Sequence, residues 1–496
     1  MEFIEKLALS FSVSLPFIGA ALIPVFAQKN ENLRDLSTVV ISIFTFIFTM
    51  VCTLKVADGS LLEMRVLTFA ENVDFYFRID ALGATFATLS SFLWIFVSIY
   101  SIGYMRALKE HSQTRFYFMF AVAIGSALGV AYSGNLLTMY MFYEILSLST
   151  YPLVLHKETE EALKAGRKYL AYLLSGAGLV LFSMILLYLT QGTTDFYAGG
   201  LFDKGSDPLI LGLIFFPLFL GFGTKAAIMP FHEWLPTAMI APTPVSALLH
   251  AVAVVKAGVF CVLRTVLYIV GPDAISESLL FSIPAILASF TIIVANVLAI
   301  SENNLKKRLA FSTINNLSIV ILGTLLLTPS GIKGSILHMV YHGFMKITLF
   351  MCAGAIYVST RKELVSELVG VGRKMPYTMF SFGICAIGLV GIPPVCGFLS
   401  KWYLCVGAIE KKEIAYLLVF LTSALLDAVY LLPIVFRGFS KDGERSVSGV
   451  AHSEQWLLLL PILVTSSCAI FLFLFPDSFF HFYGLSAKVA RSVLEY

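Results

Sequence analysis

Three titratable side chains recur at intervals of four within one apolar run. His338, His342 and Lys346 lie in the stretch LHMVYHGFMKITLFMC, residues 337–352, among aliphatic and aromatic neighbours. Residues four apart lie on the same face of an α-helix, so these side chains are expected to form one stripe. Imidazoles and amines both gain and lose protons, and the chemistry that this stripe supports is proton transfer.

Other apolar runs carry further titratable residues. These are Glu144, Lys225, His250, Lys256, Lys401 and Asp427. A charge in the middle of a membrane costs at least about 2.5–3.5 kcal/mol on insertion scales. Because such a set is hard to retain without use, we interpret it as a path for protons or other ions.

Several of these residues also have a structural interpretation. Glu144 and Lys225 are compatible with a plain ion pair. His250 and Lys256 are six apart and point to different faces of a helix, so one of them is also compatible with a bond to a neighbouring backbone group. One histidine of the stripe is compatible with simple packing.

The remaining residues differ in how far they favour proton transfer. Lys346 and Lys401 lie far from any obvious acid in the sequence, which favours a proton-carrying role. Asp427 is equally compatible with a structural position near the membrane interface. His232 and Glu233 follow a proline, where capping of the backbone is the default interpretation.

The composition indicates a polytopic membrane protein. Of the 496 residues, 58% are hydrophobic and only 13% are charged, whereas soluble domains average about 25% charged residues. The net charge of +3 gives no reason to expect nucleic acid as a partner. The seven cysteines are scattered without CxxC or His/Cys metal spacing, so we expect buried cysteines, no cofactor and no metal site.

Hydropathy over windows of about 19 residues predicts an all-α protein with about fourteen transmembrane helices. The predicted spans are 7–27, 37–54, 82–105, 115–133, 135–155, 167–190, 208–240, 243–268, 279–300, 306–327, 332–358, 376–408, 414–436 and 455–476.

Two of the predicted spans are interrupted, the seventh and the twelfth. The seventh breaks at Pro230 in KAAIMPFHEWLPTAM, and the twelfth breaks at GIPPVCGF, residues 391–398. Lys225 precedes the first break and Lys401 follows the second. Paired broken helices in the two halves of a chain are typical of inverted-repeat transporters, in which the breaks line a buried cavity.

Basic residues predict the orientation in the membrane. Loops after odd-numbered spans carry 19 Lys and Arg residues, and the termini with the even-numbered loops carry 11. By the positive-inside rule both termini lie outside the cell membrane. Basic residues near the ends of spans are counted with the adjoining loops. The other four of the 34 basic residues lie in the interior of spans, and all four are lysines. This choice is informative, because a buried lysine can release its proton whereas arginine stays charged.

Five segments in the same order resemble one family, the antiporter-like subunits shared by Mrp-type sodium/proton antiporters, respiratory complex I and membrane-bound hydrogenases. They are SGNLLTMYMFYEILSLSTYPLV, GTKAAIMPFHEWLPTAMIAPTPVSALLHAVAVVKAGVF, NLKKRLAFSTINN, LHMVYHGFMKITLFMCAGAI and GIPPVCGFLSKWYL. The resemblance covers about residues 80–440.

The resemblance implies a division of the chain. It consists of three N-terminal helices (1–110), a first inverted five-helix repeat (111–270), a second (271–440) and a C-terminal helix (441–496).

The resemblance also implies roles for the buried residues. Glu144 and Lys225 correspond to a switchable pair on the fifth and seventh helices. The relay residues are His250 and Lys256 on the eighth helix, His338, His342 and Lys346 on the eleventh, and Lys401 on the twelfth. Two positions depart from the pattern, since Asn304 and Thr237 stand where many members have acids.

Two functions fit this resemblance. The first is a proton-translocating subunit of a multisubunit Na⁺/H⁺ antiporter, similar to the D subunit of Mrp complexes and working with other membrane subunits in lipid. The second is the pumping arm of a redox complex, which would make the chain a translocase subunit without redox chemistry of its own. An intramembrane enzyme is disfavoured, because the sequence has no GxSxG or HExxH motif.

Overall fold

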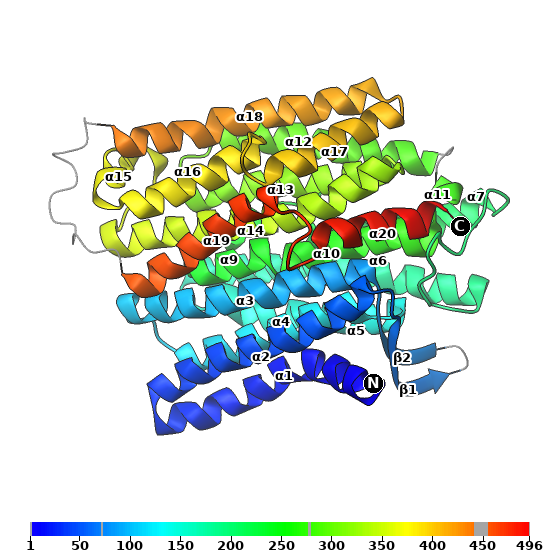
Figure 1. Ribbon diagram of the computed structural model, residues 1–496, viewed down its shortest axis with the longest axis horizontal. Coiled ribbons are helices and arrows are strands. Elements are labelled where there is room, and N and C mark those ends of the chain that lie inside the picture. Colours follow the sequence, from blue (N-terminus) through cyan, green and yellow to red (C-terminus); the bar gives the residue numbers. More distant parts are fainter. Residues whose placement is uncertain (1, 71–72, 276–278, 441–454, 496) are drawn as a thin grey trace.

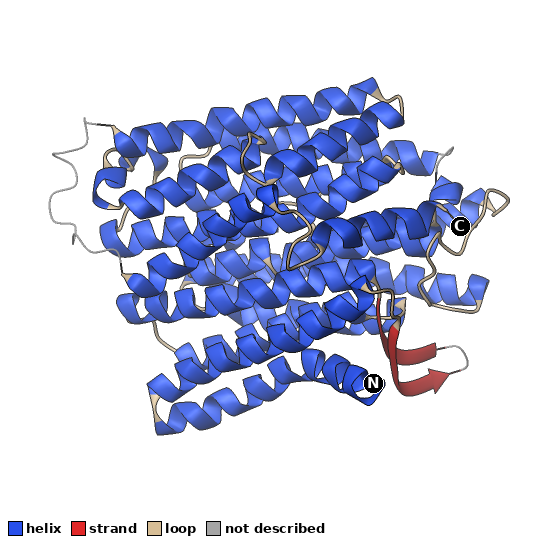
Figure 2. Ribbon diagram, viewed as in Figure 1, coloured by secondary structure: helices blue, strands red, loops and turns tan. Residues whose placement is uncertain are grey.

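The computed structural model describes residues 2–70, 73–275, 279–440 and 455–495. Most of these residues are helical, and most of the helix axes lie roughly parallel to one another, side by side (Figure 1). Figure 2 shows a single pair of strands beside the helices. The prediction of an all-α polytopic membrane protein is therefore confirmed.

Three long helices form the N-terminal part of the bundle. They are α1 (Glu2–Lys29), α2 (Glu31–Ala57) and α3 (Ala81–Leu108). Between α2 and α3 the chain forms an antiparallel hairpin of β1 (Leu62–Ala70) and β2 (Val73–Ile79). The hairpin rests on the junction of the fourth and fifth helices, where the Asn135 side chain donates a 2.6 Å hydrogen bond to the carbonyl of Asp74.

The next part of the chain contains a set of long and short helices. It consists of α4 (Gln113–Tyr132), α5 (Leu136–Val154), α6 (Glu160–Gln191), α7 (Pro208–Lys225), α8 (Trp234–Thr237), the 3₁₀ turn η1 (Ala238–Ile240), α9 (Thr243–Ala251), α10 (Val254–Arg264), the π-helical turn η2 (Thr265–Val270) and α11 (Pro272–Ile275).

A comparable set follows in the second half. It consists of α12 (Leu279–Ser301), α13 (Leu305–Leu325), α14 (Pro329–Thr360), the 3₁₀ turn η3 (Val365–Glu367), α15 (Val371–Lys374), α16 (Pro376–Val390), α17 (Gly397–Glu410) and α18 (Ile414–Phe439). The expected domain boundaries at 110, 270 and 440 stay predictions, and so does the inverted-repeat relationship.

The C-terminal region differs from the prediction of one helix. Its described part, 455–495, contains α19 (Trp456–Leu474) and a further helix, α20 (Phe482–Leu494). The shorter α20 contains Lys488 and Arg491, which lower its mean hydropathy. A window of about 19 residues therefore does not detect it. It packs against α3 and α14 (red in Figure 1).

Within the described residues, twelve helical segments are long and apolar enough to cross a membrane. The other two predicted spans correspond to α5 and to the pair α16 and α17. The break of the predicted twelfth span lies between Val390 and Gly397, and that of the seventh lies between Lys225 and α9. Each predicted span thus coincides with helix in the structure.

Side-chain caps fix where several helices begin. The backbone N–H of Gly83 donates to Asp80 at the start of α3, and that of Thr138 donates to Asn135 at the start of α5, both at 2.8 Å. Such caps satisfy donors that the first helical turn leaves unpaired. By fixing where each helix begins, these caps determine which face of the helix the later polar residues occupy.

Two spans lie at the centre of the bundle. In the segment 243–270 and in α14, every residue of the most apolar 18-residue stretch is buried. In α18 only a third of the corresponding stretch is buried. Helix α14 contacts α3, α9, α13, α16, α17, α19 and α20. Since other helices surround these two spans, their polar side chains face protein and not lipid.

The eighth span is interrupted as well, which the sequence did not predict. Helix α9 ends at Ala251 and α10 begins at Val254, with Val252 and Ala253 outside helical geometry. The Ser90 hydroxyl donates a 3.2 Å hydrogen bond to the carbonyl that Val252 leaves free. Among the described residues, three spans are therefore broken. The break in the eighth span contains neither proline nor glycine.

Candidate functional site

Lys225 ends α7 at the first break and reaches α5. Its Nζ donates hydrogen bonds to the carbonyl of Tyr143 at 2.7 Å and to the hydroxyl of Ser147 at 2.8 Å. The same nitrogen lies 3.2 Å from the centroid of the Tyr143 ring, which also favours a cation. A Cβ at Gly258 would lie 2.5 Å from the nitrogen of Ala226, so this glycine allows α10 to approach the end of α7.

Glu144 is adjacent to this lysine site but is not paired with it. It follows Tyr143 on α5, is half-buried, and forms no ion pair with Lys225 within 4.0 Å. Its buried Oε1 has no hydrogen-bond partner. The predicted pair is therefore held apart, with the ammonium on backbone and hydroxyl oxygens.

His250 stands directly before the break in the eighth span. Its ring packs against Phe350 of α14 at a centroid distance of 4.6 Å, and neither ring nitrogen has a hydrogen-bond partner. Because the helix is broken at Val252, the argument from helical faces does not apply to His250 and Lys256. Both side chains contact α14.

Lys256 on α10 contacts the histidine stripe directly. Its Nζ lies 2.8 Å from the carbonyl of Met339 and 2.8 Å from Nδ1 of His342. A protonated amine has donors only, so His342 accepts at Nδ1 when Lys256 is charged. The remaining nitrogen, Nε2, then carries the proton of the neutral ring and has no partner of its own.

His338 continues the stripe one turn earlier in α14. Its ring centroid lies 6.3 Å from that of His342. The Nδ1 atom is 2.9 Å from the hydroxyl of Ser400, and Nε2 is 3.1 Å from Oδ1 of Asn316. Asn316 donates from its amide nitrogen to the carbonyl of Ser312, so its oxygen accepts from Nε2–H. The Ser400 hydroxyl has a single proton, which it can donate either to Nδ1 of a neutral His338 or to the carbonyl of Gly397 at 3.0 Å.

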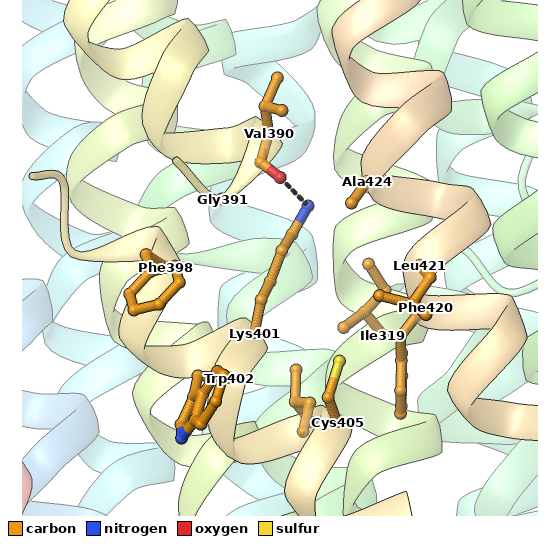
Figure 3. A pocket seen from close by; sticks show the side chains of 11 residues that line it. Ile319, Val390, Gly391, Phe398, Lys401, Trp402, Cys405, Phe420, Leu421 and Ala424 are labelled. Carbon is orange, nitrogen blue, oxygen red and sulfur yellow. Dashed lines mark hydrogen bonds between the residues drawn. The ribbon is translucent and has the colours of Figure 1, made fainter. Parts of the chain in front are cut away.

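Lys401 follows Ser400 on α17 and lies beside the second break. Its ammonium donates to Asp427 of α18 at 2.8 Å and also contacts the carbonyls of Leu389 and Val390. Figure 3 shows the side chain extending from α17 toward the end of α16. A Cβ at Gly391 would lie 2.9 Å from the Lys401 Cδ, so the glycine leaves room for the stem.

The expectation that Lys401 lies far from an acid is wrong, because Asp427 is 26 residues away in sequence but in contact in space. Asp427 is also completely buried, which excludes the interface position left open from sequence. Tyr430 donates a hydrogen bond to its Oδ1, and Asn315 donates another at 3.0 Å. The lysine–carboxylate pair thus has several further hydrogen-bond partners.

A group of amides and hydroxyls that sequence reasoning missed supports this pair. Asn315 donates to Asn296 at 3.0 Å, Asn296 donates to Ser423 at 3.1 Å, and Ser423 donates to Asn315 at 2.9 Å. Polar residues in the middle of a span, as in STINNLS (312–318), are the signal that would have found it.

Lys346 lies on α14, one turn after His342, and forms no hydrogen bond of its own. It is completely buried, and its Nζ has no hydrogen-bond partner. A buried amine in this state is either neutral or awaits a partner, because an unpaired buried charge is costly.

Two buried basic residues are arginines, Arg34 on α2 and Arg264 on α10, contrary to the expectation of lysines alone. The count of basic residues assigns Arg264 to the loop that follows the eighth span, but it ends α10 with 1% of its surface exposed and is ion-paired with Asp80. Its guanidinium carbon lies 4.6 Å from the ring centroid of Tyr268. This ion pair joins the end of α10 to the residue that caps the start of α3.

A polar cavity of about 650 Å³ opens at the end of the bundle that contains the break after α7. Its lining includes His232 and Glu233 from the break, Asn304 and Thr237 from the positions that depart from the family pattern, and Lys306. The Glu233 carboxylate is paired with Lys168 of α6. The cavity therefore opens beside the broken helix, at the end of the bundle that carries most of the basic loop residues.

The structure divides the eight predicted residues into three sets. Lys256 and His342 are in contact, and His338 is joined through Ser400 and Asn316 to the region of Lys401. Lys225 and Glu144 lie on neighbouring elements but are not ion-paired. The other two, His250 and Lys346, have no hydrogen-bond partner.

Comparison with known proteins identifies the family. Residues 133–427 match the family described as NADH:quinone oxidoreductase/Mrp antiporter, TM, and residues 67–117 match the N-terminal family of complex I chain 5. The chain belongs to the NADH:quinone oxidoreductase/Mrp antiporter family. The first matched segment contains all eight predicted residues and Asp427.

The relatives within this family include subunits of NADH-quinone oxidoreductases and subunits of cation/proton antiporters. The chain is 30% identical over 419 residues to NADH-quinone oxidoreductase subunit N of Desulforudis audaxviator, covering 80% of this chain and 82% of that one. It is also 30% identical over 415 residues to the A/B component of a probable K(+)/H(+) antiporter of Rhizobium meliloti, covering 83% of this chain but 40% of the larger relative.

The fold is that of a solved member. A chain in the structure of the Mrp complex from a Dietzia species superimposes with a TM-score of 0.84, at 20% identity, over 99% of both chains. The resemblance drawn from the five sequence segments is thereby confirmed, and the protein is a multi-pass membrane protein of this family.

Proposed function

We propose that this chain is a proton-translocating antiporter-like subunit of a multisubunit Na⁺/H⁺ antiporter. Protons pass along the membrane plane through the buried lysines and histidines of the central helices. The observation that carries the proposal is the contact of Lys256 Nζ with His342 Nδ1 at 2.8 Å inside completely buried segments. A donor and an acceptor that both titrate, in direct contact away from lipid, are what a proton relay needs.

The relay begins at the first broken helix. When Glu144 approaches Lys225, the carboxylate favours the charged amine, and when it withdraws the desolvated lysine releases its proton. In the structure the ammonium is instead held by Tyr143 and Ser147. Movement of one side chain between these two arrangements is the proposed switch, fed from the cavity beside His232.

The later steps use both nitrogens of each imidazole. His342 accepts a proton from Lys256 at Nδ1 and releases the one on Nε2. The 6.3 Å between its ring and that of His338 is too long for direct transfer, so a water or a ring rotation completes this step. His338 then connects through Ser400 to the region of Lys401 and Asp427.

The setting of the chain follows from the same proposal. It works with other membrane subunits in a cell membrane, as a D-like subunit, with lipid around it. Both termini lie on the outer side, and the cavity at residues 232–240 faces the cytoplasm, because that end carries most of the basic loop residues.

A second function is favoured by one specific similarity. The relative from Desulforudis audaxviator belongs to an NADH-quinone oxidoreductase and matches this chain over most of both lengths. The same relay would then be driven by a redox partner instead of a cation gradient. Identification of co-purifying proteins distinguishes the two, because iron–sulfur or nickel proteins indicate the redox complex.

Proton uptake by vesicles that contain the complex tests the relay. Lys225→Ala and Glu144→Ala are expected to reduce uptake to background. Lys29→Ala changes an exposed lysine at the end of α1 and is expected to leave uptake intact. Asn304→Ser, which replaces the capping amide oxygen with a capping hydroxyl, is expected to do the same. Full uptake by both relay variants would exclude the proposed path.

A further inference from the structure

Two loops far apart in sequence bring three metal-binding side chains together at one end of the bundle. Glu110 and His111 lie between α3 and α4, and His156 lies between α5 and α6. One ligand atom from each residue lies within 4.8 Å of the other two. Their separation in the chain explains why the sequence showed no metal spacing here.

The buried member of this cluster has an unmet bonding capacity. His156 is 1% exposed, and neither of its ring nitrogens has a hydrogen-bond partner. Its Nε2 faces the Glu110 carboxylate at 3.8 Å, beyond hydrogen-bond distance. Phe116 packs edge-on against the ring at 5.7 Å and His111 stacks on it at 4.9 Å. A buried imidazole without any hydrogen-bond partner calls for an explanation, and at His156, unlike His250, two other potential metal ligands lie beside the ring.

We infer that Glu110, His111 and His156 form a binding site for a divalent transition-metal ion of the Zn²⁺ type. Two imidazoles and one carboxylate are a known ligand set for Zn²⁺, with a fourth position left open. Ligand atoms around tetrahedral zinc lie roughly 3.3 Å apart, given bonds of about 2.0–2.1 Å. To reach this spacing the His111 ring must rotate out of its stack on His156, and its exposure leaves room for this, because 47% of the side chain is accessible.

A fourth donor stands beside the other three. A carboxylate oxygen of Glu158 lies 3.8 Å from Nε2 of His111, and the same oxygen is paired with Arg115 at 2.7 Å. Both Glu158 and Arg115 are well exposed, so exchanging this ion pair for a metal bond costs little. Imidazole ligands favour zinc, copper or nickel over magnesium, which prefers oxygen ligands.

A metal at this site would connect the α3–α4 loop to the end of α5. Lys157, the next residue after His156, lines the polar cavity below the broken seventh helix, and Glu144 lies further along α5. Bound metal therefore restrains the helix that carries the proposed switch and slows proton entry. This regulatory effect rests on the proposed function, whereas metal binding does not.

Zinc binding by the purified complex tests the site. The complex is prepared without a polyhistidine tag and equilibrated with Zn²⁺ against a chromophoric chelator, and zinc per chain is measured. We expect one site in the native protein that is weakened at least about tenfold by His111→Asn and by Glu110→Gln. Mg²⁺ at the same concentration is expected not to compete.

His481→Asn is the matched control, since His481 lies before α20, outside the cluster. Its positive φ of 55° is one that asparagine adopts readily, and zinc binding is expected to be unchanged. Equal affinity in the native protein and in both cluster variants overturns the inference.

Proton uptake with and without Zn²⁺ tests the regulatory effect. Zinc is expected to slow uptake by the native complex and to have much less effect on the His111→Asn variant. Binding without any effect on uptake would overturn the regulatory role and leave the metal site standing. A native complex that takes up no protons at all would instead count against the proposed function, while the binding result would be unaffected.

Discussion

Lys401 and Asp427 form an ion pair, 2.8 Å between Nζ and Oδ2, at the second break of the bundle. The carboxylate is completely buried and the lysine side chain is 11% exposed. Asp427 also accepts hydrogen bonds from Asn315 and Tyr430, so its charge is well compensated. A pair with this degree of support holds a proton on the lysine until the carboxylate moves.

The thermal stability of the complex in detergent tests this pair. Asp427→Asn is expected to destabilise the protein by about 3–5 kcal/mol, because it leaves a buried lysine without its counter-charge. The double variant Lys401→Met with Asp427→Asn is expected to recover most of that loss. Additive losses in the double variant would show that the two side chains are not energetically coupled.

Replacement of Lys256 by arginine separates charge from proton release. Lys256→Arg keeps a cation near His342 but cannot give up its proton under physiological conditions. We expect it to lower proton uptake as strongly as Lys256→Met does, with both proteins still assembling into the complex. Lys29→Arg is the control at an exposed lysine. Normal uptake by Lys256→Arg would mean that Lys256 does not carry the proton.

The partners of His338 are expected to affect the rate of transfer. Ser400→Ala removes the hydroxyl at Nδ1 and Asn316→Leu removes the acceptor at Nε2. Each leaves a buried ring nitrogen unpaired, at about 1–3 kcal/mol. Uptake rates should fall by about tenfold or more in both variants.

Ser318→Ala provides the comparison for these variants. Ser318 lies on α13, as Asn316 does, but its buried hydroxyl has no partner to lose. Its uptake rate is expected to equal that of the native protein. The same reduced rate in Ser318→Ala would attribute the effect to packing of α13 and not to His338.

The orientation in the membrane is open to a labelling experiment. Lys204→Cys places a thiol in the loop between α6 and α7, and Glu160→Cys places one at the start of α6. A membrane-impermeant maleimide is expected to label intact cells only through position 204. Background is expected to be low, because five native cysteines are buried and two are half-buried. Labelling through position 160 alone would reverse the assignment.

Local patterns in the sequence predicted much of the fold. Apolar runs of about 20 residues predict transmembrane helices, and each predicted span coincides with helix in the structure. The β-hairpin was missed although LEMRVLTFA and VDFYFRI alternate in the manner of strands. The break at Val252 had no signal, because no proline or glycine stands at it and only contacts from other helices allow it.

What the sequence alone determined is the membrane-spanning architecture and the stripe of His338, His342 and Lys346, because hydropathy and helical spacing act over a few turns of one segment. Only the tertiary structure decided that Lys401 pairs with Asp427, that Glu144 and Lys225 stand apart, and that His111 meets His156. Those contacts join different helices and loops, and their geometry depends on how the whole bundle packs, which no local pattern encodes.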